Sequence, residues 1–272
     1  MSGKALTDGE YRELLGCVFE GIPNREELVP DAVRAHLGAK TISHEALRLM
    51  LGVEPQRAVE LLAATPATTP AVITAPAGLL AILESQADRL MGIGAFGEAK
   101  VSKGKYRDEL MATAKAFVWR PELAAIGLTE VALIDYRLRG QFLAEAGSVY
   151  CYIEPDRCKN FKGIVTPDGV LVIQAQWGLK YRNKKPVWCR SNFHILEQGG
   201  VVKEGLTAYL YGGEKLLKEC YMDLPGSVSG VGRVPCLRWC GGRPLLLGVF
   251  GDGASPRFGS VSRGSVVVTG TV

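Results

Sequence analysis

The chain has 272 residues, of which 47% are hydrophobic and 22% are charged, and its formal net charge is +4. This composition is typical of folded globular proteins and excludes an intrinsically disordered chain. No apolar run approaches the roughly 20 residues that span a bilayer, and the polar N-terminus lacks the apolar stretch of a secretory signal, so we expect no membrane span and a cytoplasmic location by default.

Residues 1–63 are predicted to form a bundle of short helices. Thr7-x-x-Glu10 and Asn24-x-x-Glu27 match the capping-box pattern that opens helices, and apolar residues follow each at helical spacing. Residues 1–100 carry 13 acidic and 9 basic side chains, which disfavours a DNA-reading surface. We therefore expect a module for oligomerisation or attachment.

Residues 64–128 are predicted to combine a linker with further helices. The segment 64–76 is rich in Ala, Thr and Pro and is typical of an extended connection. Apolar periodicity then predicts helices at Gly78–Met91 and Tyr106–Phe117, with a loop between them.

From Thr129 the pattern changes to strands, so the chain is predicted to be α+β, with an irregular, mostly antiparallel domain over residues 129–272. Short helices are expected at Gly140–Glu145, Glu204–Tyr211 and Glu214–Tyr221. The predicted strands are Val131–Tyr136, Val149–Ile153, Gly163–Val165, Val170–Gln176, Val187–His194, Val234–Trp239, Leu245–Phe250, Phe258–Val261 and Ser265–Thr269.

The seven cysteines and three histidines predict neither a metal site nor a catalytic residue. Cys236-x-x-x-Cys240 lacks the two-residue spacing of a zinc knuckle, so buried free thiols are favoured over a metal. Cys189 with His194 would need an activated thiolate and an orienting group, and the sequence indicates neither. Gly92-Ile-Gly-Ala-Phe-Gly matches a nucleotide-binding pattern, but it follows a predicted helix and not a strand. No cofactor is expected.

A basic and aromatic segment, Arg157–Phe193, raises a nucleic-acid hypothesis. Arg157–Arg190 holds eight basic residues and a single acid, Asp168, and Trp177–Phe193 interleaves rings with Lys and Arg. Rings that stack on bases beside cations that neutralise phosphates are typical of single-strand binding. The favoured alternative places Trp177 and Trp188 in the core, with the lysines on an exposed turn.

The C-terminal segment has an unusual composition. Val234–Val272 contains no Lys, Glu, Gln or Met, although these four types make up 44 of the first 233 residues, a rate that predicts about seven in the last 39. Glycine-rich strands are poor in Lys and Glu, which accounts for part of the deficit.

The same segment resembles the C-terminal region of C-type-lectin-fold proteins of the formylglycine-generating-enzyme type. The matching residues are Cys236-Leu237, Gly241-Gly242-Arg243 and Gly259-Ser260-Val261-Ser262-Arg263-Gly264. Within that fold it resembles the variable proteins of diversity-generating retroelements, whose binding loops are rewritten at template adenines. Randomised AAY codons become NNY codons, which exclude Lys, Glu, Gln, Met and Trp, so Trp239 would be a fixed position.

The resemblance implies a non-enzymatic protein with a hypervariable recognition surface for a macromolecular ligand, most simply another protein. The scaffold turn would use Gly241, Gly242, Arg243 and Gly264. The ligand-binding residues would be Arg238, Leu245, Leu247, Val249, Phe250, Asp252, Ser255, Arg257 and Phe258. Two alternatives stay open: nucleic-acid binding through Arg157–Phe193, and an oxidative enzyme that uses Cys236 and Cys240.

Overall fold

The computed structural model describes residues 74–194 and 196–264, which belong to a compact unit that spans Thr74–Val272. The helices predicted before residue 64, most of the predicted linker and the strand Ser265–Thr269 lie outside the described residues. The described part combines helices with sheets and is α+β, as predicted. The predicted division after residue 128 falls inside this unit, because helices before it pack on strands after it.

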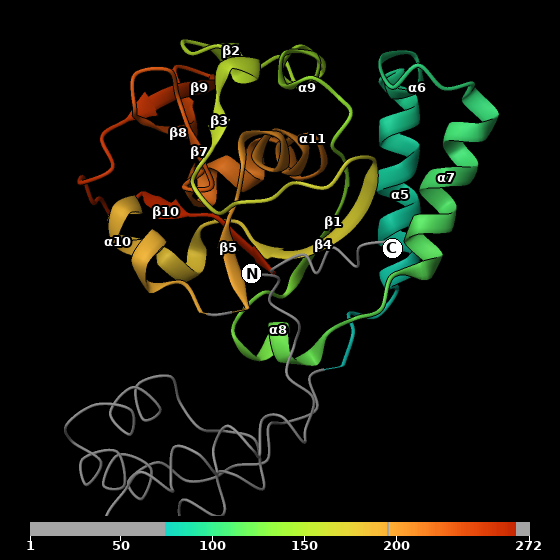
Figure 1. Cartoon of the computed structure of the whole chain (residues 1–272), viewed down its shortest axis with the longest axis horizontal. Coiled ribbons are helices and arrows are strands. Elements are labelled where there is room, and N and C mark those ends of the chain that lie inside the picture. Colours follow the sequence, from blue (N-terminus) through green and yellow to red (C-terminus); the bar gives the residue numbers. More distant parts are fainter. Residues whose placement is uncertain (1–73, 195, 265–272) are drawn as a thin grey trace, which may run out of the picture. The chain divides into compact units, whose positions relative to one another are not determined.

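A four-stranded antiparallel sheet and a five-stranded mixed sheet lie on either side of α11, which consists of two helical segments joined by a kink at Gly213 (Figure 1). Helices α5 and α7 cover the far side of the four-stranded sheet. The helices of these layers are α5 (Leu79–Gly92), α7 (Lys103–Ala116) and α11 (Val202–Glu219). The smaller sheet has the order β1 (Glu130–Asp135), β4 (Val170–Gln176), β11 (Ser262–Gly264) and β5 (Glu197–Gly199).

The five-stranded sheet has antiparallel pairs in its centre and parallel pairs at its edges. Its order is β10 (Phe258–Ser260), β6 (Tyr221–Asp223), β8 (Val234–Cys240), β9 (Arg243–Val249) and β2 (Tyr150–Cys151). Gly241 and Gly242 form the two-residue turn between β8 and β9, with φ of 61° and 76°. Positive φ at both positions is the type I′ geometry that suits a twisted hairpin and favours glycine.

Shorter elements connect these layers, and two of the sequence-based predictions for these connections are wrong. The predicted strand Val187–His194 is wrong, because Pro186 starts helix α10 (Pro186–Asn192), and proline suits the first helical position. Gly163–Val165 forms no strand, since β4 pairs with β1 instead. The others are α6 (Ala95–Glu98), α8 (Pro121–Ala125), α9 (Gly140–Ala146), η1 (Pro155–Arg157), η2 (Leu179–Tyr181), β3 (Lys159–Asn160) and β7 (Ser227–Val228).

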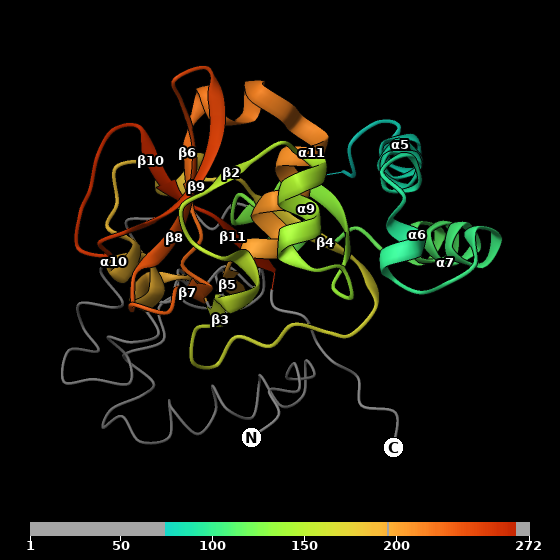
Figure 2. The same cartoon turned by 90° about the horizontal axis from the view of Figure 1, so that it is seen from above.

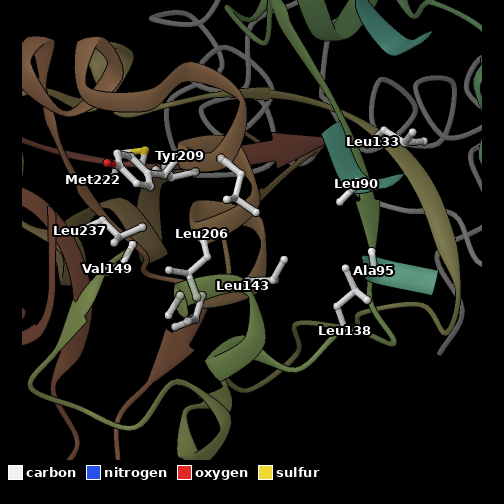
Figure 3. Packing of buried hydrophobic residues seen from close by; sticks show 14 of the residues in the cluster. Leu90, Ala95, Leu133, Leu138, Leu143, Val149, Leu206, Tyr209, Met222 and Leu237 are labelled. Carbon is white, nitrogen blue, oxygen red and sulfur yellow. The ribbon is translucent and has the colours of Figure 1, made fainter. Parts of the chain in front are cut away.

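The main hydrophobic cluster runs through the layers. It includes side chains from α5, the sheets and α11, and Figure 3 shows Leu206 of α11 near Leu237 and Val149 and, on the other side, Leu133 near Leu90. At the free edge of β1, the buried Gln86 amide donates to the Val131 carbonyl at 3.0 Å and accepts the Leu133 N–H at 2.9 Å. Helix α5 thus satisfies an edge that would otherwise expose unpaired backbone groups.

Strand β11 is held by buried polar contacts on both faces of the four-stranded sheet. On one face, Arg263 Nε lies 2.6 Å from Glu204 Oε1, and both side chains are fully buried. Tyr136 Oη donates to the same carboxylate at 2.5 Å, and Glu204 Oε2 accepts the Val201 N–H at 2.9 Å. On the other face, Ser262 Oγ donates to Glu197. Because a buried charge must be compensated, this network specifies where β11 lies.

We expect Arg263→Met to lower the free energy of unfolding by about 3–5 kcal/mol, because Glu204 would be left buried and unpaired. Chemical denaturation followed by circular dichroism measures this. The control is Arg107→Met, whose pair with Asp88 is exposed and should contribute less than about 1 kcal/mol. Equal small losses in both variants would contradict the role given to the buried pair.

Candidate functional site

The five-stranded sheet has one face packed on α11 and one face turned away from it. Met222, Leu237 and Leu246 lie side by side by register and belong to the main hydrophobic cluster with Leu206. Figure 3 shows Met222, Leu237 and Leu206 of this cluster. Since successive residues of a strand point to opposite faces, the residues between them point away from α11. We call this second surface the outer face.

The register arranges the outer face in rows across the strands. One row continues from Ser260 through Asp223, Cys236 and Leu247. The next contains Phe258, Tyr221, Arg238, Leu245 and Tyr150, and the last contains Cys240 and Arg243.

One end of the outer face is closed by α10. This helix contacts β10, and Cys189 of the helix is buried together with Ser260, Asp223 and Cys236 of the sheet. Burial raises the pKa of the Asp223 carboxyl to about 7, and Asp223 Oδ1 has no hydrogen-bond partner among the described residues. Burial likewise raises the pKa of the Cys236 thiol well above its ordinary value, so this thiol stays protonated and unreactive.

The other end of the outer face is open and rich in aromatic and arginine side chains. Tyr150 and Tyr152 are 47% and 63% exposed, and their ring centroids lie 5.0 Å apart in an edge-to-face arrangement. The Arg243 guanidinium lies 4.4 Å from the Tyr150 ring centroid. Arg238 and Leu247 are half-buried beside them.

The loop 250–257 connects β9 to β10 and projects at the side of the sheet remote from α5 and α7 (Figure 2). Phe250 is 68% exposed, with the Arg233 guanidinium 4.5 Å from its ring centroid. Asp252 and Arg257 are exposed and Ser255 is half-buried. The Val187 N–H donates to the Gly251 carbonyl at 3.0 Å, which ties the start of the loop to α10.

The nine residues predicted to bind a ligand fall into two groups. Arg238, Leu245, Leu247, Val249 and Phe258 share the outer face, while Phe250, Asp252, Ser255 and Arg257 belong to the loop 250–257. Leu245 is only 4% exposed, between its register partners Arg238 and Tyr150, so its side chain is removed from any contact surface.

Sequence reasoning missed part of the open end. Tyr150 and Tyr152 reach it because β2 pairs in parallel with β9, a long-range contact. The alternation in Val149–Ile153 predicts the strand but not its neighbour. Of the predicted scaffold residues, Arg243 contributes its side chain to the face, and Gly264 lies in β11, where a Cβ would come within 2.5 Å of Leu123.

The basic segment Arg157–Phe193 is divided between core and surface. Trp177 is partly buried against the main hydrophobic cluster and against a second, smaller cluster that includes Ile134 and Ile173. Trp188 is 44% exposed on α10, with Lys184 Nζ 5.3 Å from its ring centroid. Lys180 is paired with Glu197 at 2.7 Å. The prediction that both tryptophans lie in the core therefore holds for Trp177 and is wrong for Trp188.

The candidate thiols do not converge on a reactive centre. Cys236 and Cys240 are four residues apart in the extended strand β8, a separation of about 13 Å, which is too far for a shared metal ion. Across residues 74–194 and 196–264, no group of three or more His, Cys, Asp or Glu side chains is placed to hold a metal. His194 Nδ1 accepts the Leu196 N–H at 3.2 Å.

A cavity of about 550 Å³ lies between β1, η2 and α11. Its size suits a small molecule. Three of its polar side chains are committed to the fold, because Gln86 binds the β1 backbone, Gln176 binds Ser260 and Gly178, and Lys180 binds Glu197. The cavity is also lined by Thr129, Glu130, Lys215 and Glu219.

No protein-family model, curated protein or solved structure matches the chain. Within the described part, no helix has both the length and the apolar character to cross a membrane.

The raised pKa of Asp223 implies that the stability of the protein depends on pH. An unfolded aspartate ionises near pH 4, whereas folded Asp223 keeps its proton until about pH 7, so stability falls as pH rises between these values. Asp223→Asn should remove this loss and be more stable than the parent at pH 8 by up to about 4 kcal/mol, with little difference at pH 4.

Urea denaturation at several pH values measures the difference between the two proteins. Asp252→Asn is the control, because Asp252 is exposed and its substitution should shift stability by less than about 0.5 kcal/mol throughout. If the free energies of unfolding of the parent and the Asp223→Asn variant differed by the same amount at every pH, the raised pKa of Asp223 would be refuted.

Proposed function

We propose that this chain is a non-enzymatic ligand-binding protein that presents a hypervariable recognition surface on a C-type-lectin-like scaffold. The surface is the open end of the outer face together with the loop 250–257. The observation that carries the proposal is the register of β8, β9 and β10, which gathers five of the nine residues predicted from composition and resemblance on one side of the sheet.

The chemistry of this surface supports recognition of a macromolecule. Its exposed and half-buried side chains include Tyr150, Tyr152, Arg238, Arg243 and Phe258. Tyr, Phe and Arg are enriched, and Lys and Glu depleted, where proteins bind one another. A few such anchors supply most of the affinity of an interface.

The backbone beneath the surface suits side chains that change. The inner face of the same strands is fixed by packing on α11, and the turn at Gly241-Gly242 is fixed by its positive φ angles. Outer side chains can therefore vary without disturbing the core. Burial of the Cys236 thiol, with its raised pKa, supports a binding role over an enzyme that uses Cys236 and Cys240.

Substitutions at two adjacent residues of β9 test whether the outer face tolerates change while the inner face does not. Leu247→Ser on the outer face should change the free energy of unfolding by less than about 1 kcal/mol, because Leu247 is half-buried. Leu246→Ser on the inner face should cost at least about 3 kcal/mol, because Leu246 is fully buried. Thermal and urea denaturation compare the two, and equal losses would argue against an adaptable outer face.

The genomic neighbourhood tests the proposed function itself. We expect a reverse transcriptase gene beside this one, with a near-copy of the coding segment for Val234–Val272 that differs at adenines. Differences between the copies should fall at codons such as those of Arg238, Leu247 and Arg257, and spare Leu237 and Arg263. Absence of both the near-copy and the reverse transcriptase would count decisively against diversification.

A second candidate function is single-strand nucleic-acid binding by α10 and its flanks. The exposed Trp188 ring beside Lys184 favours it, since stacking and phosphate contacts occur together at such sites. Salt-sensitive binding of a labelled oligonucleotide that is lost in Trp188→Ala would support it.

A further inference from the structure

The arginines of the recognition surface form no ion pair with a carboxylate of the described residues. Six other arginines do form ion pairs, namely Arg107, Arg120, Arg137, Arg139, Arg157 and Arg263, whereas Arg89, Arg182, Arg190 and Arg233 form none within residues 74–194 and 196–264. Arg238 and Arg243 on the outer face, and Arg257 next to it, form none within residues 74–194 and 196–264. The surface therefore carries positive charge that the described fold does not neutralise.

Arg238 gives the clearest indication of a missing acceptor. Its Nε is buried but has no hydrogen-bond partner among the described residues. A buried donor without an acceptor costs roughly 1–3 kcal/mol, and a ligand that supplies the acceptor recovers this energy. Arg238 lies in the middle row of the outer face, beside Leu245.

Arg243 is positioned in a way that suits an anionic partner. Its guanidinium lies 4.4 Å from the Tyr150 ring centroid, so the ring supports the planar group while other donors of the guanidinium are free for a ligand. A guanidinium held in this way can bind a carboxylate with two parallel hydrogen bonds.

The composition of the C-terminal segment explains why these charges are unpaired. Between Val234 and Val272 the sequence contains no Glu, and Asp252 is the single acid. Asp252 belongs to the loop 250–257, and Asp223, which belongs to the outer face, is a β6 residue buried at the closed end. Neighbouring strands thus supply Arg without a matching carboxylate.

From these contacts we infer that the recognition surface binds an acidic polypeptide, whose Asp or Glu side chains pair with Arg238 and Arg243 while apolar groups pack on Tyr150 and Leu247. This inference rests on the proposed binding function and names its partner. A polypeptide is favoured over a nucleic acid because the surface has few cations, no lysine, and apolar side chains between its arginines. The lysine-rich turn near α10 is a separate surface.

A displayed library of random peptides, selected on the full chain, tests the inference. Recovered peptides should contain more Asp and Glu than the input library. Their affinity should fall at least tenfold in Arg238→Gln/Arg243→Gln, because each lost charge-assisted hydrogen bond contributes about 1.5–3 kcal/mol. Arg243→Gln alone, at an exposed position, should give a smaller loss without affecting folding.

Lys184→Gln/Lys185→Gln is the matched control, because it removes the same charge from the exposed turn before α10. Acidic peptides that are lost equally in both double variants would indicate general charge attraction and overturn the inference. Displacement of the peptides by single-stranded oligothymidylate more readily than by polyglutamate would also overturn it, in favour of a nucleic acid.

The same selection separates this inference from the proposed function. Peptides whose binding depends on Arg238 and Arg243 but that are not enriched in Asp and Glu would support the proposed recognition surface. They would refute the inference that its partner is acidic. Failure to recover any peptide that depends on the outer face, while peptides for other surfaces are recovered, would refute both.

Discussion

The buried ion pair between Arg263 and Glu204 is the constraint on which the position of the proposed recognition surface depends. It holds β11 in the four-stranded sheet, and a single residue, Val261, separates β11 from β10 in the five-stranded sheet. The chain therefore crosses between the sheets at a fixed point. Because β10 is anchored in this way, the loop before it has a rigid C-terminal end.

The second buried carboxylate strengthens the same anchor from the opposite face. Glu197 accepts from Lys180, Tyr181 and Ser262, so it joins β5, η2 and β11. Buried charges are costly unless they are fully paired. Here they fix the position of β11, because any shift of this strand would leave at least one buried carboxylate without its partner. A rigid framework of this kind suits the proposed adaptable binding surface. Its backbone is already ordered in the free protein, so little further conformational entropy is lost when a partner binds.

The outer face combines two chemical regions that share the same strands. Under α10, Ser260, Asp223 and Cys236 are buried, and the high pKa of Asp223 keeps this region free of charge in mildly acidic solution. At the open end, Arg238 and Arg243 keep their charge without a carboxylate partner in the described fold. Burial under one helix separates the part of the sheet that supports the fold from the part that can meet a ligand.

Local patterns in the sequence determined much of the secondary structure. Apolar periodicity predicted α5 and α7, the alternation around residues 234–250 predicted β8 and β9, and Gly241-Gly242 marked a turn, because these features depend on neighbouring residues. Local reasoning failed at α10, where Val187–His194 has the apolar content of a strand but follows a proline that starts a helix. It also could not show that Arg263 is buried, since burial of an arginine requires a distant partner.

The sequence alone thus determined the composition of the last 39 residues. It also determined which side chains of β8, β9 and β10 alternate between the two faces of the sheet. Only the tertiary structure decided that Tyr150 and Tyr152 join them, that Leu245 is covered and that Asp223 lies beneath α10. The physical reason is that strand pairing between residues 150 and 245, and ion pairing between residues 204 and 263, are long-range contacts, and no local pattern encodes which distant segment completes them.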